Sequence, residues 1–112
     1  MWSGRSKYKA RKTVVDGITF DSKREAERYI ELREMESSGG ISNLQRQVRI
    51  ELVPPFDRNG QHFRGIYYVA DFVYTGADGN IVWEDVKGMK TSVYLIKRKL
   101  VAYRYGMNIK ET

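Results

Sequence analysis

The sequence contains no cysteine and a single histidine, His62. The absence of cysteine excludes a disulfide framework and a thiolate metal site, so a bound metal ion would be held by oxygen ligands or by His62. Oxygen ligands favour hard cations. We therefore expect Mg²⁺ or Mn²⁺ as the cofactor if the protein uses a metal, and no small-molecule cofactor.

Long hydrophobic runs are also absent, because no apolar segment approaches the roughly 20 residues of a membrane span. The N-terminus lacks the apolar segment of a signal peptide, so we expect a cytoplasmic protein that makes no membrane contact. The 112 residues, of which 41% are hydrophobic, fit one compact domain. No internal repeat or low-complexity segment divides them.

Acidic residues are missing from the first 13 positions, whose basic side chains supply most of the formal net charge of +6. We divide the chain into a basic, flexible N-terminal arm, residues 1–13, and a single domain, residues 14–112. A basic arm indicates a polyanion partner, and nucleic acid is favoured over a membrane surface. The alternative is a terminus that only improves solubility. The basic residues of the arm are Arg5, Lys7, Lys9, Arg11 and Lys12.

A hairpin and a helix are predicted directly after the arm. Asp16-Gly17 lies between two apolar triplets, which is typical of a tight turn, so we expect a two-stranded ribbon over residues 13–20. Ser22 and Glu25 have the spacing of a capping box. A helix should therefore begin there and end near Ser37.

The middle of the chain is predicted to form three strands. Apolar and charged residues alternate over residues 48–52, which indicates a strand with one buried face. The polar stretch 56–65 is interpreted as a loop or flap. Residues 66–74 and 81–87 are almost continuously apolar, so they should form two central strands of the sheet.

A second helix should begin at Ser92 and end before Gly106, and residues 107–110 should form a last strand parallel to the preceding one. The element order is then ββ-α-βββ-α-β. This order predicts an α/β protein of the α+β type, with helices packed on a mixed sheet. The apolar face of the second helix would consist of Val93, Ile96, Leu100 and Tyr103.

The chemically informative residues are Asp71, inside one central strand, and Asp85 and Lys87, inside the next. A three-residue loop over residues 77–79, with Gly79 in the left-handed position, would place Asp71 directly across from Asp85. Lys87 shares their face by the two-residue period of a strand. Two carboxylates and one ammonium would then meet, as needed to hold a hard cation against a phosphate and to position a water for attack.

A structural salt bridge between Lys87 and one of the aspartates is the alternative explanation, although one lysine cannot neutralise two neighbouring carboxylates. Glu84 lies on the other face by parity and opposes Phe72. An error in the register would exchange the roles of Glu84 and Asp85.

These residues resemble a known motif. Ala70-Asp71 followed by Asp85-Val86-Lys87 is similar to the PD-(D/E)XK nuclease motif, and residues 22–25 resemble the glutamate-bearing first helix of that superfamily. Small phage and prophage nucleases related to Holliday junction resolvases resemble the chain over roughly residues 7–111. Ala70 stands where the motif has proline, a position that supplies no ligand. Lys99 stands where related exonucleases have glutamine, which argues against an exonuclease.

The resemblance implies a restriction-endonuclease-like core and a Mg²⁺ ion held by Asp71, Asp85 and the Val86 carbonyl. Lys87 would orient or polarise the attacking water, and Glu25 would complete the metal shell. Glu25 has an alternative role as a helix-capping residue, which it cannot easily combine with metal binding. A phage origin, also implied only by the resemblance, would place the protein in the bacterial host cytoplasm.

The preferred hypothesis is an endonuclease that hydrolyses phosphodiester bonds in branched DNA, with a Holliday junction as the substrate, in phage recombination or replication. A symmetric junction needs two cuts, so the resolvase should be a homodimer. The alternatives are a duplex-nicking or repair-type endonuclease and a non-catalytic DNA-binding module. We expect contacts to phosphates and DNA shape. Beyond the arm, the residues expected to contact DNA are Gln47, Arg58, Arg64, Lys90, Lys97, Arg98 and Lys99.

Overall fold

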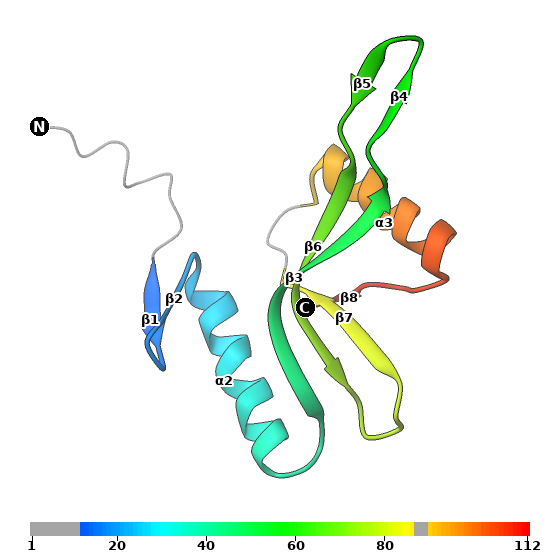
Figure 1. Cartoon of the computed structure of the whole chain (residues 1–112). Helices are drawn as coiled ribbons and strands as arrows, with labels where there is room; N and C mark the ends of the chain where they lie inside the picture. The colour runs from blue at the N-terminus through cyan, green and yellow to red at the C-terminus, as the bar shows by residue number, and fades with distance from the viewer. Residues whose placement is uncertain (1–11, 87–89) are drawn as a thin grey trace, which may run out of the picture.

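The computed structural model describes residues 12–86 and 90–112 and shows a mixed sheet of four strands with two helices (Figure 1). The strand order in the sheet is β3-β6-β7-β8. The α+β class with a mixed sheet, expected from the sequence, is therefore confirmed. Within the described residues, no helix has the length and hydrophobicity required to span a membrane.

The N-terminal hairpin and helix have the predicted boundaries. Strands β1 (Thr13–Val15) and β2 (Ile18–Phe20) pair in antiparallel fashion around the turn formed by Asp16 and Gly17, whose φ angles are 53° and 75°. These positive φ values explain the Asp-Gly sequence. Helix α2 (Lys23–Ser37) begins after Ser22, whose side chain accepts a hydrogen bond from the Glu25 amide.

Three long strands form most of the sheet: β3 (Ser42–Val53), β6 (Ile66–Thr75) and β7 (Ile81–Asp85). Strand β6 lies between the other two and pairs with both in antiparallel fashion. Thr75 pairs with Ile81 and Phe72 with Glu84, which is the register predicted from the three-residue loop. Gly79 has a φ of 86°, as that loop requires. Strand β3 is longer than the five residues predicted, because its polar first half also pairs with β6.

The predicted flap over residues 56–65 is instead a regular hairpin, which projects from the sheet in Figure 1. Its strands are β4 (Phe56–Arg58) and β5 (Gln61–Phe63), and the Phe56 and Phe63 rings stack with centroids 4.9 Å apart. The turn is Asn59-Gly60, with φ values of 54° and 76°. This dipeptide is a strong hairpin signal, and the polar composition of the segment obscured it.

Helix α3 (Ser92–Tyr105) ends at Gly106, which has a left-handed φ of 66° as predicted. Strand β8 (Lys110–Glu111) then pairs in parallel fashion with β7, although it is shorter and later than expected. The predicted apolar face of α3 is wrong. Tyr94 and Val101 are buried, whereas Val93, Ile96 and Tyr103 are exposed and only Leu100 of the predicted set packs against the core.

Two hydrophobic clusters hold the fold together. The buried residues of β6 belong to one cluster in the first half of the strand and to the other in the second half. Phe72 and Tyr74 in the second half of β6 pack with α2 and the first hairpin. Tyr68 and Ala70 in the first half of β6 pack with Tyr94, Val101 and Ile109 of the α3 cluster. Asp71 therefore lies at the point where the core changes from one helix to the other. A polar side chain can reach the surface there without displacing core residues.

Candidate active site

Asp71 is half-buried, and both of its carboxylate oxygens accept hydrogen bonds. The Gln47 amide nitrogen donates to Oδ1 over 3.2 Å, and the Val86 backbone N–H donates to Oδ2 over 2.8 Å. Gln47 comes from β3 and Val86 directly follows β7. The carboxylate of Asp71 thus joins the three neighbouring strands at one point.

Asp85 lies at the end of β7 and is buried, with 2% of its surface exposed. The pairing of β6 with β7 ends at Phe72 and Glu84, and Asp71 and Asp85 are the next residues of the two strands beyond that pair. Burial, together with the negative charges of Asp85 and Asp71, raises the pKa of the Tyr68 hydroxyl.

Glu25 directs its carboxylate toward Asp71, through Gln47. The same Gln47 amide nitrogen that contacts Asp71 donates to Glu25 Oε2 over 3.1 Å, and Arg46 Nη2 lies 3.7 Å from that oxygen. The two roles considered for Glu25 separate here: its backbone N–H is capped by Ser22, while its side chain turns to the candidate site. Burial and the charge of Asp71 raise the pKa of Glu25.

Gln47 is placed at the site by an unusual backbone conformation. Its φ is 51°, in the left-handed region that a residue with a side chain rarely adopts within a strand. Its neighbours Arg46 and Val48 pair with Phe72 and Ala70, so Gln47 stands across from Asp71. Non-glycine residues in this conformation are concentrated at functional sites. The expectation that Gln47 could reach the carboxylate cleft is confirmed.

Replacing Glu25 by glutamine is expected to leave the protein as stable as the wild type, or more stable, at neutral pH. A raised pKa means that the folded state holds a proton which the unfolded state has already lost, so folding stability falls as pH rises through that interval. The neutral glutamine avoids this loss. Urea unfolding at pH 7 and pH 4 measures the effect: Glu25→Gln should gain relative to the wild type at pH 7, and the gap should shrink at pH 4. The prediction is contradicted if the stability of Glu25→Gln relative to the wild type is lower at pH 7 than at pH 4.

Glu84 faces away from this site, as the strand parity predicts. It is fully buried and binds Arg28, with Nε to Oε2 at 2.5 Å and Nη2 to Oε1 at 3.0 Å. Tyr74 and Thr112 donate further hydrogen bonds to its carboxylate. Burial alone would raise the pKa of Glu84, but these hydrogen bonds outweigh it and the pKa is lowered. Glu84 is therefore a satisfied structural carboxylate.

Another group of polar residues lies near Asp85, and the sequence analysis did not predict it. Glu111 of β8 pairs in register with Asp85, and the Tyr94 hydroxyl donates to Glu111. Burial and the hydrogen bond to Glu111 raise the pKa of Tyr94. The hydrogen bond from Tyr94 and those from Lys90 and Arg98 lower the pKa of Glu111 to about 2. A parallel β8 was predicted, but its register was not, and the register alone brings Glu111 beside Asp85.

The carboxylates are not gathered into a ready-made metal cage. Within residues 12–86 and 90–112, no group of three or more Asp, Glu or His side chains is arranged to hold a metal ion. Lys87, the predicted water-orienting residue, lies outside the described residues, as do Arg5, Lys7, Lys9 and Arg11 of the arm. Two carboxylates on neighbouring strands nevertheless suit Mg²⁺, which usually keeps several waters and takes only one or two protein carboxylates plus a substrate phosphate.

A protein-family model described as "Protein of unknown function (DUF1064)" matches residues 5–112, nearly the whole chain. The chain belongs to DUF1064. No curated protein and no solved structure matches it. The match includes all the carboxylates described above, so the candidate site lies within the part that this DUF1064 chain shares with its family.

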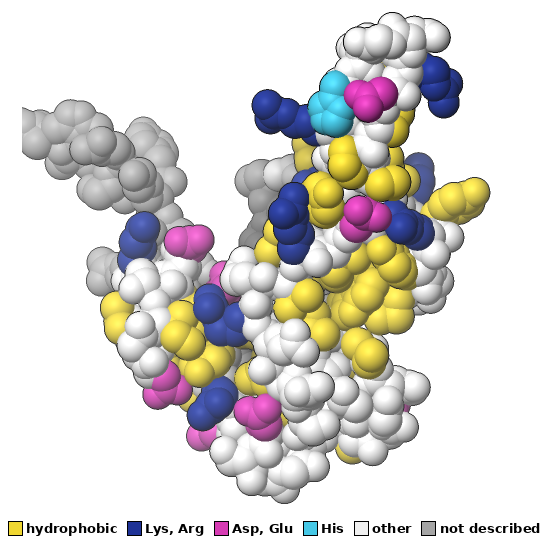
Figure 2. Space-filling view, in the orientation of Figure 1, with side chains coloured by type: hydrophobic (Ala, Val, Ile, Leu, Met, Phe, Trp, Pro, Cys, Tyr) yellow, Lys and Arg dark blue, Asp and Glu magenta, His cyan; other side chains and the backbone are white. Residues whose placement is uncertain are grey.

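The basic residues expected to contact DNA are in several different environments in the DUF1064 chain. Lys90 and Arg98 form ion pairs with Glu111, at 3.1 and 2.9 Å. Lys97 lines a hollow of about 260 Å³ that also contains Asp85. On the face shown in Figure 2, Lys and Arg side chains lie on both sides of a recess between the α2 part of the molecule and the β4–β5 hairpin. The exposed members of the predicted set are Lys12, Gln47, Arg58, Arg64, Lys90 and Lys99.

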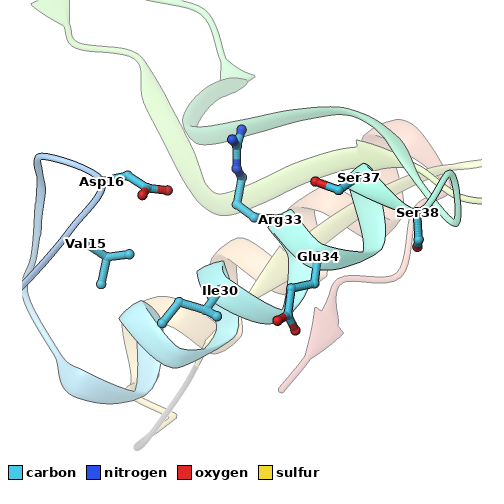
Figure 3. Close-up of a pocket in the computed structure, with 7 residues that line it drawn as sticks. All are labelled: Val15, Asp16, Ile30, Arg33, Glu34, Ser37 and Ser38. Carbon is cyan, nitrogen blue, oxygen red and sulfur yellow. The ribbon is translucent and has the colours of Figure 1, made fainter.

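A larger hollow, of about 620 Å³, lies elsewhere, between the first hairpin and the C-terminal half of α2 (Figure 3). Its lining includes Asp16, Arg33 and Glu34, and none of the candidate site residues. The Asp16 carboxylate accepts a hydrogen bond from the buried Tyr29, which gives it a structural role. This hollow is therefore not the candidate reactive site of the DUF1064 chain, although it is larger than the hollow beside Asp85.

Proposed function

We propose that the protein is a metal-dependent DNA endonuclease that hydrolyses phosphodiester bonds. The observation that carries the proposal is the position of Asp71 and Asp85, two carboxylates that lie next to the last residue pair, Phe72 and Glu84, of the neighbouring strands β6 and β7. Ionised groups inside a sheet are costly unless hydrogen-bonded, paired or bound to a cation. Glu84, one residue from Asp85, has a full set of partners and therefore serves the fold.

The arrangement of the sheet supports a restriction-endonuclease-like core. Helix α2 precedes an antiparallel β3-β6-β7 sheet, and α3 crosses over to the parallel strand β8. The two aspartates of the sequence motif that resembles PD-(D/E)XK lie on β6 and β7, with Glu25 on α2. Agreement between the positions of the motif and the topology is stronger support than either alone.

Asp71, Asp85 and the Val86 carbonyl would hold Mg²⁺ or Mn²⁺, with Glu25 at the edge of the site. When bound, the ion would neutralise the scissile phosphate and lower the pKa of a coordinated water. Gln47 would bridge the Asp71 and Glu25 carboxylates and hold them in place by donating to both, since its one amide nitrogen lies within 3.2 Å of each. Lys87 would orient the attacking water. Burial, and after it the charge of Asp71, raises the pKa of Glu25, and a cation at the site would favour the ionised carboxylate.

We propose branched DNA, with a Holliday junction as the preferred substrate, and a homodimer that makes two symmetric cuts. The basic residues on both sides of the recess in Figure 2 would contact phosphates over an extended surface. Homodimerisation follows from the symmetry of the substrate, since an enzyme with one site makes one cut at a time.

Cleavage should require both a divalent ion and the Asp85 carboxylate, and should be strongest on a four-way junction. The test incubates the wild type and Asp85→Ala with labelled four-way junction, nicked duplex and linear duplex, each with Mg²⁺ or EDTA. Paired symmetric cuts on the junction, absent with EDTA and absent in Asp85→Ala, are the expected result. Cleavage of duplex DNA regardless of branching would show that the substrate is duplex DNA and not the junction. Cleavage in the presence of EDTA would reject the proposed requirement for a metal ion.

A non-catalytic DNA-binding module is the second candidate, and one observation favours it. Both Asp71 oxygens already accept hydrogen bonds from Gln47 and Val86, so this carboxylate is satisfied without an ion. Binding of all three DNA substrates with no cleavage under any metal condition would establish this candidate.

A further inference from the structure

The hollow beside Asp85 continues into a second one along α3. The first, of about 260 Å³, is lined by residues that include Tyr68, Asp85, Val93 and Lys97. The second, of about 380 Å³, shares Val93 and Lys97 with it and ends at Gly65. The two form one groove between β6 and the N-terminal half of α3, which leads from the candidate catalytic carboxylate to the base of the β4–β5 hairpin.

The wall of this groove is apolar and open to solvent. Val93 and Ile96 on α3 are 61% and 59% exposed, although the helix has buried residues elsewhere. Large exposed apolar side chains that gather beside a charged group indicate a binding surface more often than scattered ones do. The exposed apolar residues that line the groove are Ile66, Val69, Val93 and Ile96.

An aromatic ring is held in a fixed position at the far end of the groove. The Arg49 guanidinium lies 3.8 Å from the centroid of the Tyr67 ring. The ring also passes so close to Gly65 that a Cβ atom there would meet it at 2.9 Å, and the Val53 carbonyl oxygen at 2.8 Å. Gly65 therefore allows the close approach, and Tyr67 is preorganised as a flat surface.

The cation of the groove is Lys97, which lines both hollows. Its neighbours Lys90 and Arg98 are held by Glu111 on another side of α3. A flat aromatic surface, apolar walls and one ammonium group together match a nucleotide, whose base is apolar on its faces and whose phosphate is anionic. A base in a duplex is stacked on both sides and cannot enter such a groove, whereas an unpaired base can.

We infer that this groove takes one unpaired nucleotide of the DNA strand next to the bond that is cut. The base lies against Tyr67, Ile96 and Val93, and its phosphate contacts Lys97. This inference rests on the proposed function and adds a binding preference to it. At a branch point the groove holds a base that has separated from its partner, so DNA in which a duplex meets single-stranded nucleotides binds more tightly than a blunt duplex. A second copy of the chain fits the face less well, because Lys97, which lines it, would oppose its symmetric copy.

The DNA itself supplies the most direct test. Binding is measured by fluorescence anisotropy in EDTA, so the result does not depend on cleavage. A duplex with a short single-stranded arm should bind about tenfold more tightly than a blunt duplex of equal length at the same salt concentration. Replacing the first unpaired nucleotide by an abasic one should remove most of that advantage. Equal binding of the armed and blunt duplexes, or of the intact and abasic arms, would overturn the inference.

Variants then locate the effect on the protein. Ile96→Ser changes an exposed side chain of the groove, and Tyr103→Ser, at a position 88% exposed near the other end of α3, is the matched control. Ile96→Ser should lose about fivefold or more of the preference for the armed duplex, while Tyr103→Ser should keep it. Light scattering on the same samples reports the oligomeric state. A change from dimer to monomer in Ile96→Ser, with the DNA preference unchanged, would assign the face to protein association and reject the nucleotide.

Failure of the inference and failure of the proposed function give different results. Junction cleavage together with equal binding of armed and blunt duplexes rejects the groove alone. A preference for the armed duplex without cleavage under any metal condition rejects the nuclease and retains the groove.

Discussion

Replacing Asp71 by asparagine is expected to reduce DNA cleavage by about three orders of magnitude, because a bound cation contributes several kcal/mol to the reaction and asparagine carries no charge to hold it. The substitution preserves the size and shape of the side chain. It removes one acceptor, since Val86 N–H and the Gln47 amide both donate to Asp71 in the wild type. The free energy of unfolding should therefore fall by only about 1 kcal/mol.

Single-turnover cleavage of a four-way junction with saturating protein measures the rate, and anisotropy in EDTA measures DNA affinity separately. Asp78→Asn is the matched control, because Asp78 is an exposed aspartate of the loop between β6 and β7 that bonds the Asn80 amide. The asparagine oxygen can keep that bond, so the control should retain wild-type cleavage. If the cleavage rate of Asp71→Asn were within tenfold of the wild-type rate, Asp71 would have no role in the reaction.

The sequence predicted the register of β6 against β7 because short-range chemistry fixes it. Gly79 in a three-residue loop sets the register of β6 against β7, and strand parity then assigns Glu84 and Asp85 to opposite faces. The helix boundaries were predictable for the same reason, since Ser22 and Gly106 act on the residues next to them. Local signals of this kind do not depend on how the rest of the chain packs.

The features that the sequence did not reveal depend on contacts between distant segments. The buried face of α3 contains Tyr94 and Val101, which pack against Tyr68 and Ala70 of β6 and against Ile109. The pairing of Glu111 with Asp85 depends on the position at which the chain leaves α3 and enters β8. Hydrophobic spacing along α3 identified a stripe that the structure leaves partly exposed. Part of this stripe lines the groove beside Asp85.

The candidate site and the change of core at the middle of the sheet are physically connected. Gln47 and Asp71 stand across from each other where β3 and β6 pass from the α2 cluster to the α3 cluster. Residues at that boundary are not needed to fill either core. Polar side chains in the central strands therefore cost less folding free energy at this point than elsewhere in the sheet.

Glu84→Ala is expected to lower the free energy of unfolding by about 3–5 kcal/mol at pH 7, because it leaves the Arg28 guanidinium without its buried partner. Urea unfolding measures the loss. Glu31→Ala is the matched control, since Glu31 also pairs with Arg28 over 2.9 Å but is exposed. A surface ion pair contributes about 1 kcal/mol or less, so the control should change stability little.

The pH dependence of a second variant, Glu84→Gln, separates the contribution of the ion pair from simple loss of packing. The pKa of Glu84 is lowered from its usual value of 4.5, so the folded state favours the ionised form. Its stabilisation is present above pH 4.5 and is lost as pH falls through the lowered pKa. The gap between wild type and Glu84→Gln, which has a similar volume, should therefore narrow when the pH is lowered below 4.5. A gap independent of pH would mean that Glu84 stabilises the protein by filling space, with its charge contributing nothing.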